Sequence, residues 1–332
     1  MQNIIDFKDY FIKDKIIAYK THFNSSLDEL NIIVNSYKLN RLIFCNYDYK
    51  HVYDLENFDK DYSDDGHNGI FLSSEPSKFN HPVNNISIEI TCINFSQNFN
   101  QPIDNLPLKL LKLFLGFMFN QPINNLPNSL THLILYVNFN YTVDNLPLSI
   151  TYLSLGDVFY QTVNNLPLSI TYLSFGHRFD QSVDNLPYSL TNLSFGYNFN
   201  QPVNNLPCSL TNLSFDYNFN QPVNDLPHSI THLSFGNSFN QSINNLPQSI
   251  THLTLGENFK NQFNLPKNII SVKLSSACGD IIISGNGIPK SFELVHSYRK
   301  FKFKPLIDQS DISKYELSND YEITFDREMR YF

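Results

Sequence analysis

An apolar residue returns every 20 positions along most of this chain. Phenylalanine stands at ten positions with this unbroken spacing: Phe79, Phe99, Phe119, Phe139, Phe159, Phe179, Phe199, Phe219, Phe239 and Phe259. If this phenylalanine is position 1 of each block, positions 5, 8, 12, 15 and 17 are also mostly apolar, and Asn, Ser, Thr and Pro fill much of the rest. A fixed period of this length is typical of solenoids, in which each block forms one coil that buries its apolar side chains against its neighbours.

Each block contains one predicted strand and one extended return segment. SLTNLSF at 209–215 sets Leu210, Leu213 and Phe215 among polar neighbours and favours a strand, whereas FNQPVNNLP at 199–207 has prolines and no helical period. We therefore expect flattened coils whose strands pair in parallel about 4.8 Å apart. Positions 1, 5, 8, 12, 15 and 17 should face the interior, in the third block as Phe119, Ile123, Leu126, Leu130, Leu133 and Leu135.

The repeated polar residues have predicted structural roles. Asparagine dominates positions 2 and 7, where its amide is expected to bond to backbone groups at turns or to the equivalent asparagine of the next coil. Threonine at position 13 runs without a break from Thr131 to Thr251 and predicts a second ladder. Glycine at position 18 is interpreted as a turn residue and not as part of a phosphate loop.

The sequence before the repeats, residues 1–78, predicts an N-terminal cap. Residues 1–37 are expected to be helical, and Ser26 to Glu29 matches a capping box. KLNRLIFCNYD at 38–48 resembles the strand half of a block, so a degenerate repeat is expected there. Residues 48–70 are acidic and predict an exposed loop.

That acidic loop matches a calcium-binding loop only in part. Asp61, Ser63, Asp65 and Gly66 stand at its positions 1, 3, 5 and 6, but the twelfth position is Leu72 where a glutamate is needed. A solvated loop is therefore the prediction, and no metal site is assigned.

Residues 79–278 form the ten-repeat region, and 279–332 are expected to contain a last degenerate coil and a cap. GIPKSFELVHS at 287–297 resembles the Leu-Pro-x-Ser-Leu core of the repeats. RKFKFK at 299–304 alternates basic and aromatic residues, which fits a terminal strand with one wet face, the alternative being a contact with nucleic acid.

Composition limits the classes of partner and of compartment. The chain has 332 residues, 16% of them charged, and a formal net charge of −8, which argues against nucleic acid as the main partner. Its four scattered cysteines show neither zinc spacing nor a disulfide framework. The N-terminal residues do not resemble a signal peptide, and no stretch approaches a membrane span. We expect a cytoplasmic protein, monomeric, without a cofactor.

The repeat resembles a known family. The pattern Leu-Pro-x-Ser-Leu-x-x-Leu is similar to short leucine-rich repeats, and FNQPINNLPNSLTHL at 119–133 resembles the FNIP repeat of social amoebae and of giant viruses that infect amoebae. The resemblance implies a right-handed coil stack with a parallel sheet on the concave face and an irregular convex side. For a viral member it implies the host cytoplasm and a host partner. Many members carry an N-terminal F-box that recruits a ubiquitin ligase, but residues 1–50 lack its early Leu-Pro start and its helical leucine pattern.

In leucine-rich repeats, positions 14 and 16 of such a block point outward from the strands, where partners usually bind. Position 16 is mostly serine here, whereas positions 14 and 19 vary. The candidate binding residues are Tyr152, Tyr172, Asn192, Asn212, His232 and His252 at position 14, and His177, Tyr197 and Tyr217 at position 19. The alternative is that identical neighbours only reflect recent repeat duplication. His232 and His252 stand on neighbouring strands, but no carboxylate or thiol occupies the adjacent positions 14, so a metal is not predicted.

No catalytic set stands out from the repeat pattern, and no residue is assigned to catalysis. The sequence thus predicts a non-enzymatic solenoid that binds a protein through its concave face. One alternative is the substrate-recognition subunit of a ubiquitin ligase, acting through a divergent F-box. Another is an enzymatic or carbohydrate-binding β-helix, which three sheets in cross-section would favour.

Overall fold

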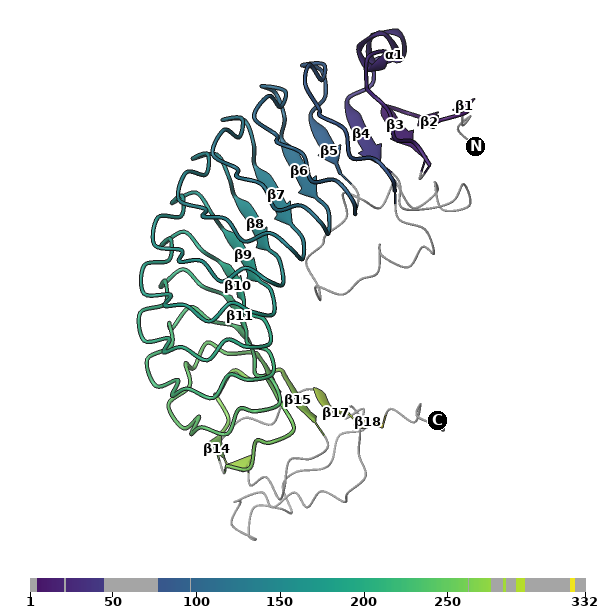
Figure 1. Ribbon diagram of the computed structural model, residues 1–332. Helices are drawn as coiled ribbons and strands as arrows, with labels where there is room; N and C mark the ends of the chain where they lie inside the picture. Colours follow the sequence, from purple (N-terminus) through teal and green to yellow (C-terminus); the bar gives the residue numbers. More distant parts are fainter. Residues whose placement is uncertain are drawn as a thin grey trace. The chain divides into compact units, whose positions relative to one another are not determined.

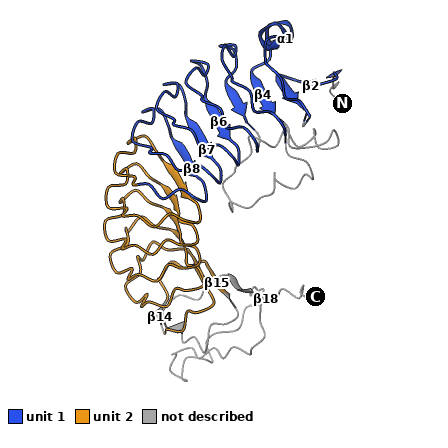
Figure 2. Cartoon of the chain, viewed as in Figure 1, with its two compact units in different colours: residues 1–161 blue, residues 162–332 orange. Residues whose placement is uncertain are grey.

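The computed structural model describes residues 5–20, 22–44, 77–95, 97–261, 263–275, 283–284, 291–295 and 323–325. The acidic loop at 48–70, with its partial calcium-loop match, and the basic-aromatic segment at 299–304 lie outside these residues. The chain forms two compact units, residues 1–161 and residues 162–332 (Figure 2).

Unit 1 is a β-solenoid with one strand in each coil (Figure 1). β1 and β2 pair antiparallel, as do β2 and β3, and every later pairing from β3 to β8 is parallel. Its elements are β1 (Ile5–Asp6), β2 (Tyr10–Lys13), β3 (Ile16–Tyr19), α1 (Leu30–Tyr37), β4 (Arg41–Phe44), β5 (Cys92–Asn94), β6 (Lys112–Leu115), β7 (His132–Leu135) and β8 (Tyr152–Leu155).

Unit 2 continues the same type of coil, and all its described pairings are parallel. β14 pairs with β16 in a small second sheet, and the other strands form the main one. Its strands are β9 (Tyr172–Phe175), β10 (Asn192–Ser194), β11 (Asn212–Ser214), β12 (His232–Ser234), β13 (His252–Leu255), β14 (Phe263–Asn264), β15 (Ser271–Ser275), β16 (Ile283–Ser284), β17 (Ser291–Val295) and β18 (Ile323–Phe325).

The predicted register and core positions are confirmed. Strand partners lie 20 residues apart, as in Leu193 opposite Leu213, and the one-residue deletion in the tenth block is absorbed by pairing His252 with Ser271. In the third block all six predicted interior side chains are buried. The degenerate coils predicted at both ends are also present, because β4 pairs in parallel with β5 and β17 with β15.

Stacked phenylalanine rings run through the interior of both units. In unit 1, the rings of Phe99 and Phe119 lie 6.2 Å apart at an interplanar angle of 2°. In unit 2, Phe195 at position 17 fills the space beside Phe199 at position 1, with ring centroids 3.7 Å apart. Identical side chains at a 20-residue spacing therefore stack on one another, which ties the register of each coil to that of its neighbours.

The asparagine ladder at position 2 satisfies backbone groups that no strand reaches. The Oδ1 of Asn80 accepts the backbone N–H of Asn100 at 2.9 Å, and the same bond joins Asn200 to Asn220 and Asn220 to Asn240. The predicted backbone role of these asparagines is confirmed. The return segments thus hold one another through side-chain acceptors where a strand would use its own carbonyls.

Threonine and serine form two further ladders along the start of the strands. At position 13, Thr231 Oγ1 donates to the Thr211 carbonyl at 3.2 Å, and Thr251 repeats the contact with Thr231, which confirms the predicted threonine ladder. At position 11, Ser229 Oγ donates to the Leu210 carbonyl at 2.6 Å. The serine ladder was not predicted, although the nearly constant serine at this position was its signal.

Two predictions about polar positions need correction. Asparagine at position 7 bonds to position 6 of the preceding coil, as in Asn205 Nδ2 to Asp184 Oδ1 at 3.0 Å, and not to its own equivalent. Glycine at position 18 serves close packing, because a Cβ on Gly196 would lie 2.3 Å from the Gly176 carbonyl oxygen. The backbones of successive coils approach closely at this point, and that approach, not a special turn conformation, favours glycine there.

The N-terminal region differs most from its prediction. Residues 5–19 contain three strands, and the helix predicted over 1–37 covers only Leu30–Tyr37. The predicted capping box is not formed, since the helix N-cap is Glu29 without a side-chain bond, and Ser26 Oγ instead donates to Asp28 Oδ2. The apolar residues of β3 follow the period of a strand that joins the sheet edge, which overrides their helical reading.

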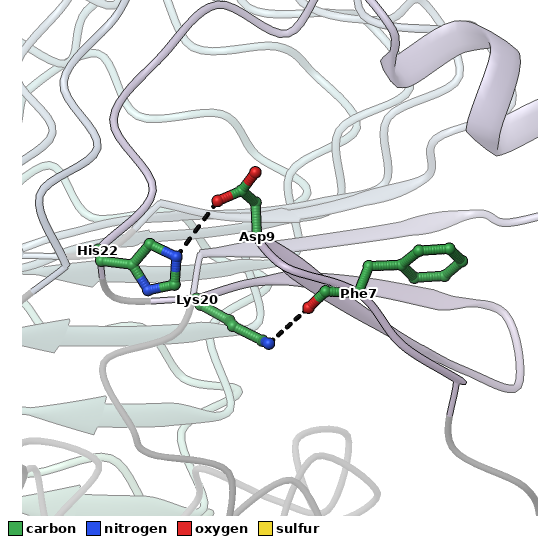
Figure 3. Close-up of polar contacts among 4 residues, drawn as sticks. All are labelled: Phe7, Asp9, Lys20 and His22. Atoms are coloured by element: carbon green, nitrogen blue, oxygen red, sulfur yellow. Dashed lines mark hydrogen bonds and ion pairs between the residues drawn. The ribbon is translucent and has the colours of Figure 1, made fainter.

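Polar contacts at the base of the hairpin hold it closed. Lys20 Nζ donates to the Phe7 carbonyl at 2.5 Å, and His22 Nε2 lies 3.2 Å from Asp9 Oδ1 (Figure 3). Backbone bonds from Lys20 N–H to the Asp9 carbonyl and from Phe7 N–H to the Tyr10 carbonyl complete the base. These contacts bring antiparallel pairing to the end of an otherwise parallel sheet.

The asparagine ladder predicts a graded response to substitution at Asn220. Asn220→Ala removes the acceptor for the Asn240 backbone N–H and should lower the free energy of unfolding by about 0.5–1.5 kcal/mol. Asn220→Asp should leave it nearly unchanged, because Asp180 Oδ1 naturally accepts the equivalent bond from Asn200. Urea denaturation measures both, and amide exchange at Asn240 should accelerate only in the alanine variant. Equal stability of the two variants would show that the ladder is dispensable.

Candidate protein-binding face

The face of the sheet that points away from the coil interior, called the outward face below, is formed by positions 14 and 16. In β8, β9 and β13 the second and fourth residues are buried, and the first and third, at these two positions, are partly exposed. Alternation of side chains along a strand produces this division. The described coils of both units carry one main strand each and an irregular return, which does not match the three-sheet cross-section of the β-helix alternative.

In unit 1 much of the outward face is apolar and buried. Phe114 and Ile134 occupy position 16, where later coils have serine, and their exposed fractions are only 4% and 6%. The buried apolar cluster on this face consists of Ile16, Ala18, Ile43, Cys92, Phe114 and Ile134. Position 16 is therefore not uniformly a small polar residue, and the accessible part of the face lies further along the chain.

Tyr152 is the candidate residue that lies in unit 1. It packs against the apolar cluster together with Tyr136, and its ring stacks on His132 with centroids 5.6 Å apart and an interplanar angle of 15°. Half of this side chain is thus committed to packing. Its remaining surface borders the buried part of the face.

In unit 2 the outward face carries a polar row, defined as Tyr172, Asn192, Asn212, His232 and His252. Strand pairing places each of these residues directly beside the next, from Tyr172 opposite Asn192 to His232 opposite His252. All are partly or fully exposed. The sequence prediction of a continuous row at position 14 is correct in geometry for these five residues.

The position 19 residues form a second, aromatic row beside the first. The rings of Tyr197 and Tyr217 stack with centroids 4.8 Å apart at 7°, and His177 lies 6.3 Å from Tyr197 at a tilt of 48°. Tyr197 and Tyr217 are 40% and 38% exposed. Stacking limits the rotamers of these rings, so the row presents a rigid aromatic surface whose contact with a partner costs little side-chain entropy.

The threonine ladder determines the tautomer of the paired histidines. Thr231 Oγ1 lies 2.9 Å from His232 Nδ1, and Thr251 Oγ1 lies 2.9 Å from His252 Nδ1. Each hydroxyl already donates its single hydrogen to a carbonyl of the preceding coil. The hydroxyl must therefore accept from the ring, so Nδ1 carries the hydrogen and Nε2 keeps its lone pair.

The two imidazoles also affect each other's charge. Their rings stack with centroids 4.2 Å apart and an interplanar angle of 5°. Desolvation of the His232 ring, one face of which is covered by His252, and the charge of His252 lower the pKa of His232 below its usual value of 6.5. Both rings are thus favoured in the neutral form at neutral pH.

Searches for other kinds of site were made over the same described residues. No cluster of three or more His, Cys, Asp or Glu side chains there has the arrangement of a metal site. No helix in that part of the chain has the length and apolarity to cross a membrane. Cys92 is buried and Cys208 exposed, both as free thiols.

Comparison with known proteins identifies the repeat. A family model of the FNIP repeat matches residues 119–158, 142–178, 160–198, 199–238, 222–257 and 239–277. Among solved structures, the chain is similar to CroV588, described as a novel circular LRR protein, with 32% identity and a TM-score of 0.63. The similarity covers 90% of this chain and 49% of that one, so this chain spans about half the length of its structural relative. No curated protein matches.

The stacked histidines predict a linked titration. His252→Asn removes one of the two causes that lower the His232 pKa, so that pKa should rise part of the way toward 6.5, and burial should keep it from rising fully. Because the lowered pKa makes the unfolded chain the better proton acceptor, stability should fall as pH drops below 6.5, and less steeply in the variant. NMR titration of the His232 ring measures the shift. An unchanged or lower pKa in the variant would contradict the coupling.

Proposed function

Because the chain belongs to the FNIP-repeat proteins, with coils of the leucine-rich-repeat type, we propose that it is a non-enzymatic scaffold that binds a protein partner through its outward face. The binding surface in this proposal consists of the polar row of unit 2 and the aromatic row beside it. Tyr152 contributes from unit 1. The proposed site of action is the cytoplasm, as a monomer, and for a viral member it is the cytoplasm of the host.

The observation that carries this proposal is the confinement of variation to the outward side of the coil. Interior positions repeat almost unchanged, and the asparagine, serine and threonine positions repeat because they bond to neighbouring coils. Positions 14 and 19 have no such constant duty, and they carry Tyr, Asn and His in turn. A surface that varies on a constant frame is where specificity for a partner can reside.

The chemistry of the two rows suits a protein surface. The stacked tyrosines supply apolar area with hydroxyl groups, which makes tyrosine a frequent anchor of protein interfaces. The polar row adds amide groups from Asn192 and Asn212 and the Nε2 acceptors of His232 and His252. The two rows contain no Lys, Arg, Asp or Glu, so binding should depend on apolar contact and hydrogen bonds and only weakly on salt.

The ubiquitin-ligase alternative has less support. An F-box is a helical module, whereas described residues 5–44 hold three short strands, the eight-residue helix α1 and a strand that joins the repeat sheet. Its test is separate: a fragment is not needed, because the full chain should capture a ligase adaptor if an F-box is present.

Affinity capture tests the proposed surface. The full chain is used as bait in a lysate of amoebal cells, the hosts implied by the family resemblance, and compared with a variant carrying Tyr172→Ala, Tyr197→Ala and Tyr217→Ala. The control variant carries Tyr141→Ala, Tyr160→Ala and Tyr188→Ala, which removes tyrosines that are 42%, 51% and 67% exposed at positions outside the two rows.

We expect the first variant to lose partners that wild type and control retain, by at least about tenfold in captured amount, since interface tyrosines commonly contribute more than 1 kcal/mol each. Thermal melts of the variants should stay close to wild type, because these side chains are not core. Retention of every partner by the first variant refutes the proposed surface.

A further inference from the structure

His232 and His252 form a pair of imidazoles that differs from every other described histidine. They are directly opposite in the pairing of β12 with β13, and their rings are stacked within 4.2 Å and nearly parallel. His132 stacks instead on Tyr152, and His177 lies beside Tyr197. Only at 232 and 252 do two ring nitrogens lie side by side on the accessible part of the outward face.

The Nδ1 side of both rings is held by a built set of bonds. Nδ1–H donates to the adjacent threonine hydroxyl at 2.9 Å, and that hydroxyl donates to a backbone carbonyl of the preceding coil. Metal-binding histidines in proteins have this arrangement, in which the ring N–H that faces away from the metal donates to a fixed oxygen and thereby sets the tautomer and the ring orientation. The two Nε2 lone pairs are left on the solvent side.

We propose that His232 and His252 bind a divalent transition-metal cation through their Nε2 atoms. The site is open, with two protein ligands, and water fills the remaining positions. Imidazole nitrogen suits Zn²⁺, Ni²⁺ and Cu²⁺, whereas Ca²⁺ and Mg²⁺ require oxygen ligands that the pair lacks. This inference is independent of the proposed protein partner, since it concerns a cation on two residues of the same face.

The geometry requires a small side-chain adjustment. At a metal–nitrogen distance of about 2.0–2.1 Å, tetrahedral coordination separates two ligand nitrogens by roughly 3.4 Å. The ring centroids are 4.2 Å apart, so the rings must tilt toward each other at their Nε2 edges. Rotation about the side-chain torsions gives this tilt without moving the strands, because both rings lie on the outward face and only the Nδ1 edge is held.

The neighbours in the row supply matched variants. Asparagine is the natural residue at position 14 of the two preceding coils, where Thr191 Oγ1 donates to Asn192 Oδ1 and Thr211 Oγ1 to Asn212 Oδ1, each at 2.8 Å. His232→Asn and His252→Asn therefore keep the bond to threonine and the strand pairing and remove only a ligand nitrogen. His132→Asn is the control that removes a position 14 histidine outside the pair.

The test is a titration of the full chain, free of any affinity tag, with CuCl₂ at pH 7.5, followed by calorimetry and electron paramagnetic resonance. Wild type should bind one more equivalent of Cu²⁺ than the double variant, with two nitrogen ligands in its spectrum. Each single variant should lose that equivalent, and the double variant should be no worse than either. His132→Asn should match wild type.

Melting temperatures without metal should agree within a few degrees across the variants, which separates loss of the site from loss of the fold. The proposal is overturned if the double variant binds Cu²⁺ with the stoichiometry and spectrum of wild type. It is also overturned if each single variant loses only half of the difference, because independent sites on separate histidines would give that result. Neither outcome bears on the capture of a protein partner by the tyrosine rows.

Discussion

The structure depends on the stacking of identical side chains at a spacing of 20 residues. Phenylalanine rings at position 1 lie about parallel in successive coils, as Phe199 and Phe219 do at 6.0 Å and 8°, and no described ring of this ladder is more than 1% exposed. A coil of this size buries too little by itself to offset its ordering entropy, so it is stable only on a neighbour in the same register. A shift of one residue would turn every interior side chain outward.

The polar ladders follow from the same constraint. Once the coils are in register, Asn220 faces Asn240, and Thr231 faces Thr251, so one side chain per coil can satisfy the backbone of the next. These bonds serve the frame without charges, which accounts for a chain that is only 16% charged. They also leave positions 14 and 19 without a fixed structural duty, and the Tyr, Asn and His residues that differ between coils are found there.

Sequence reasoning succeeded where a pattern was repeated and failed where it occurred once. The interior positions, the strands and the asparagine and threonine ladders were predictable because ten blocks give the same answer. The hairpin at β2 and β3 was missed because Ile16 to Tyr19 is a single apolar run whose period does not separate a strand from a helix. The buried outward cluster was missed because the serines of later coils hid the meaning of Phe114 and Ile134. The tautomer of His232 needed the position of Thr231 Oγ1, which no sequence pattern supplies.

The most direct measurement of this account is the stability of chains shortened by a whole and by half a period. Removal of residues 200–219 joins Phe199 to Asn220 and keeps the register, so urea denaturation should show a cooperative transition with a β-type circular dichroism spectrum and a reduced m-value. Removal of residues 200–209 breaks the register and should abolish that cooperativity. Equal behaviour of the two shortened chains, whether both fold or both fail, would contradict the claim that stacking in a 20-residue register holds the structure together.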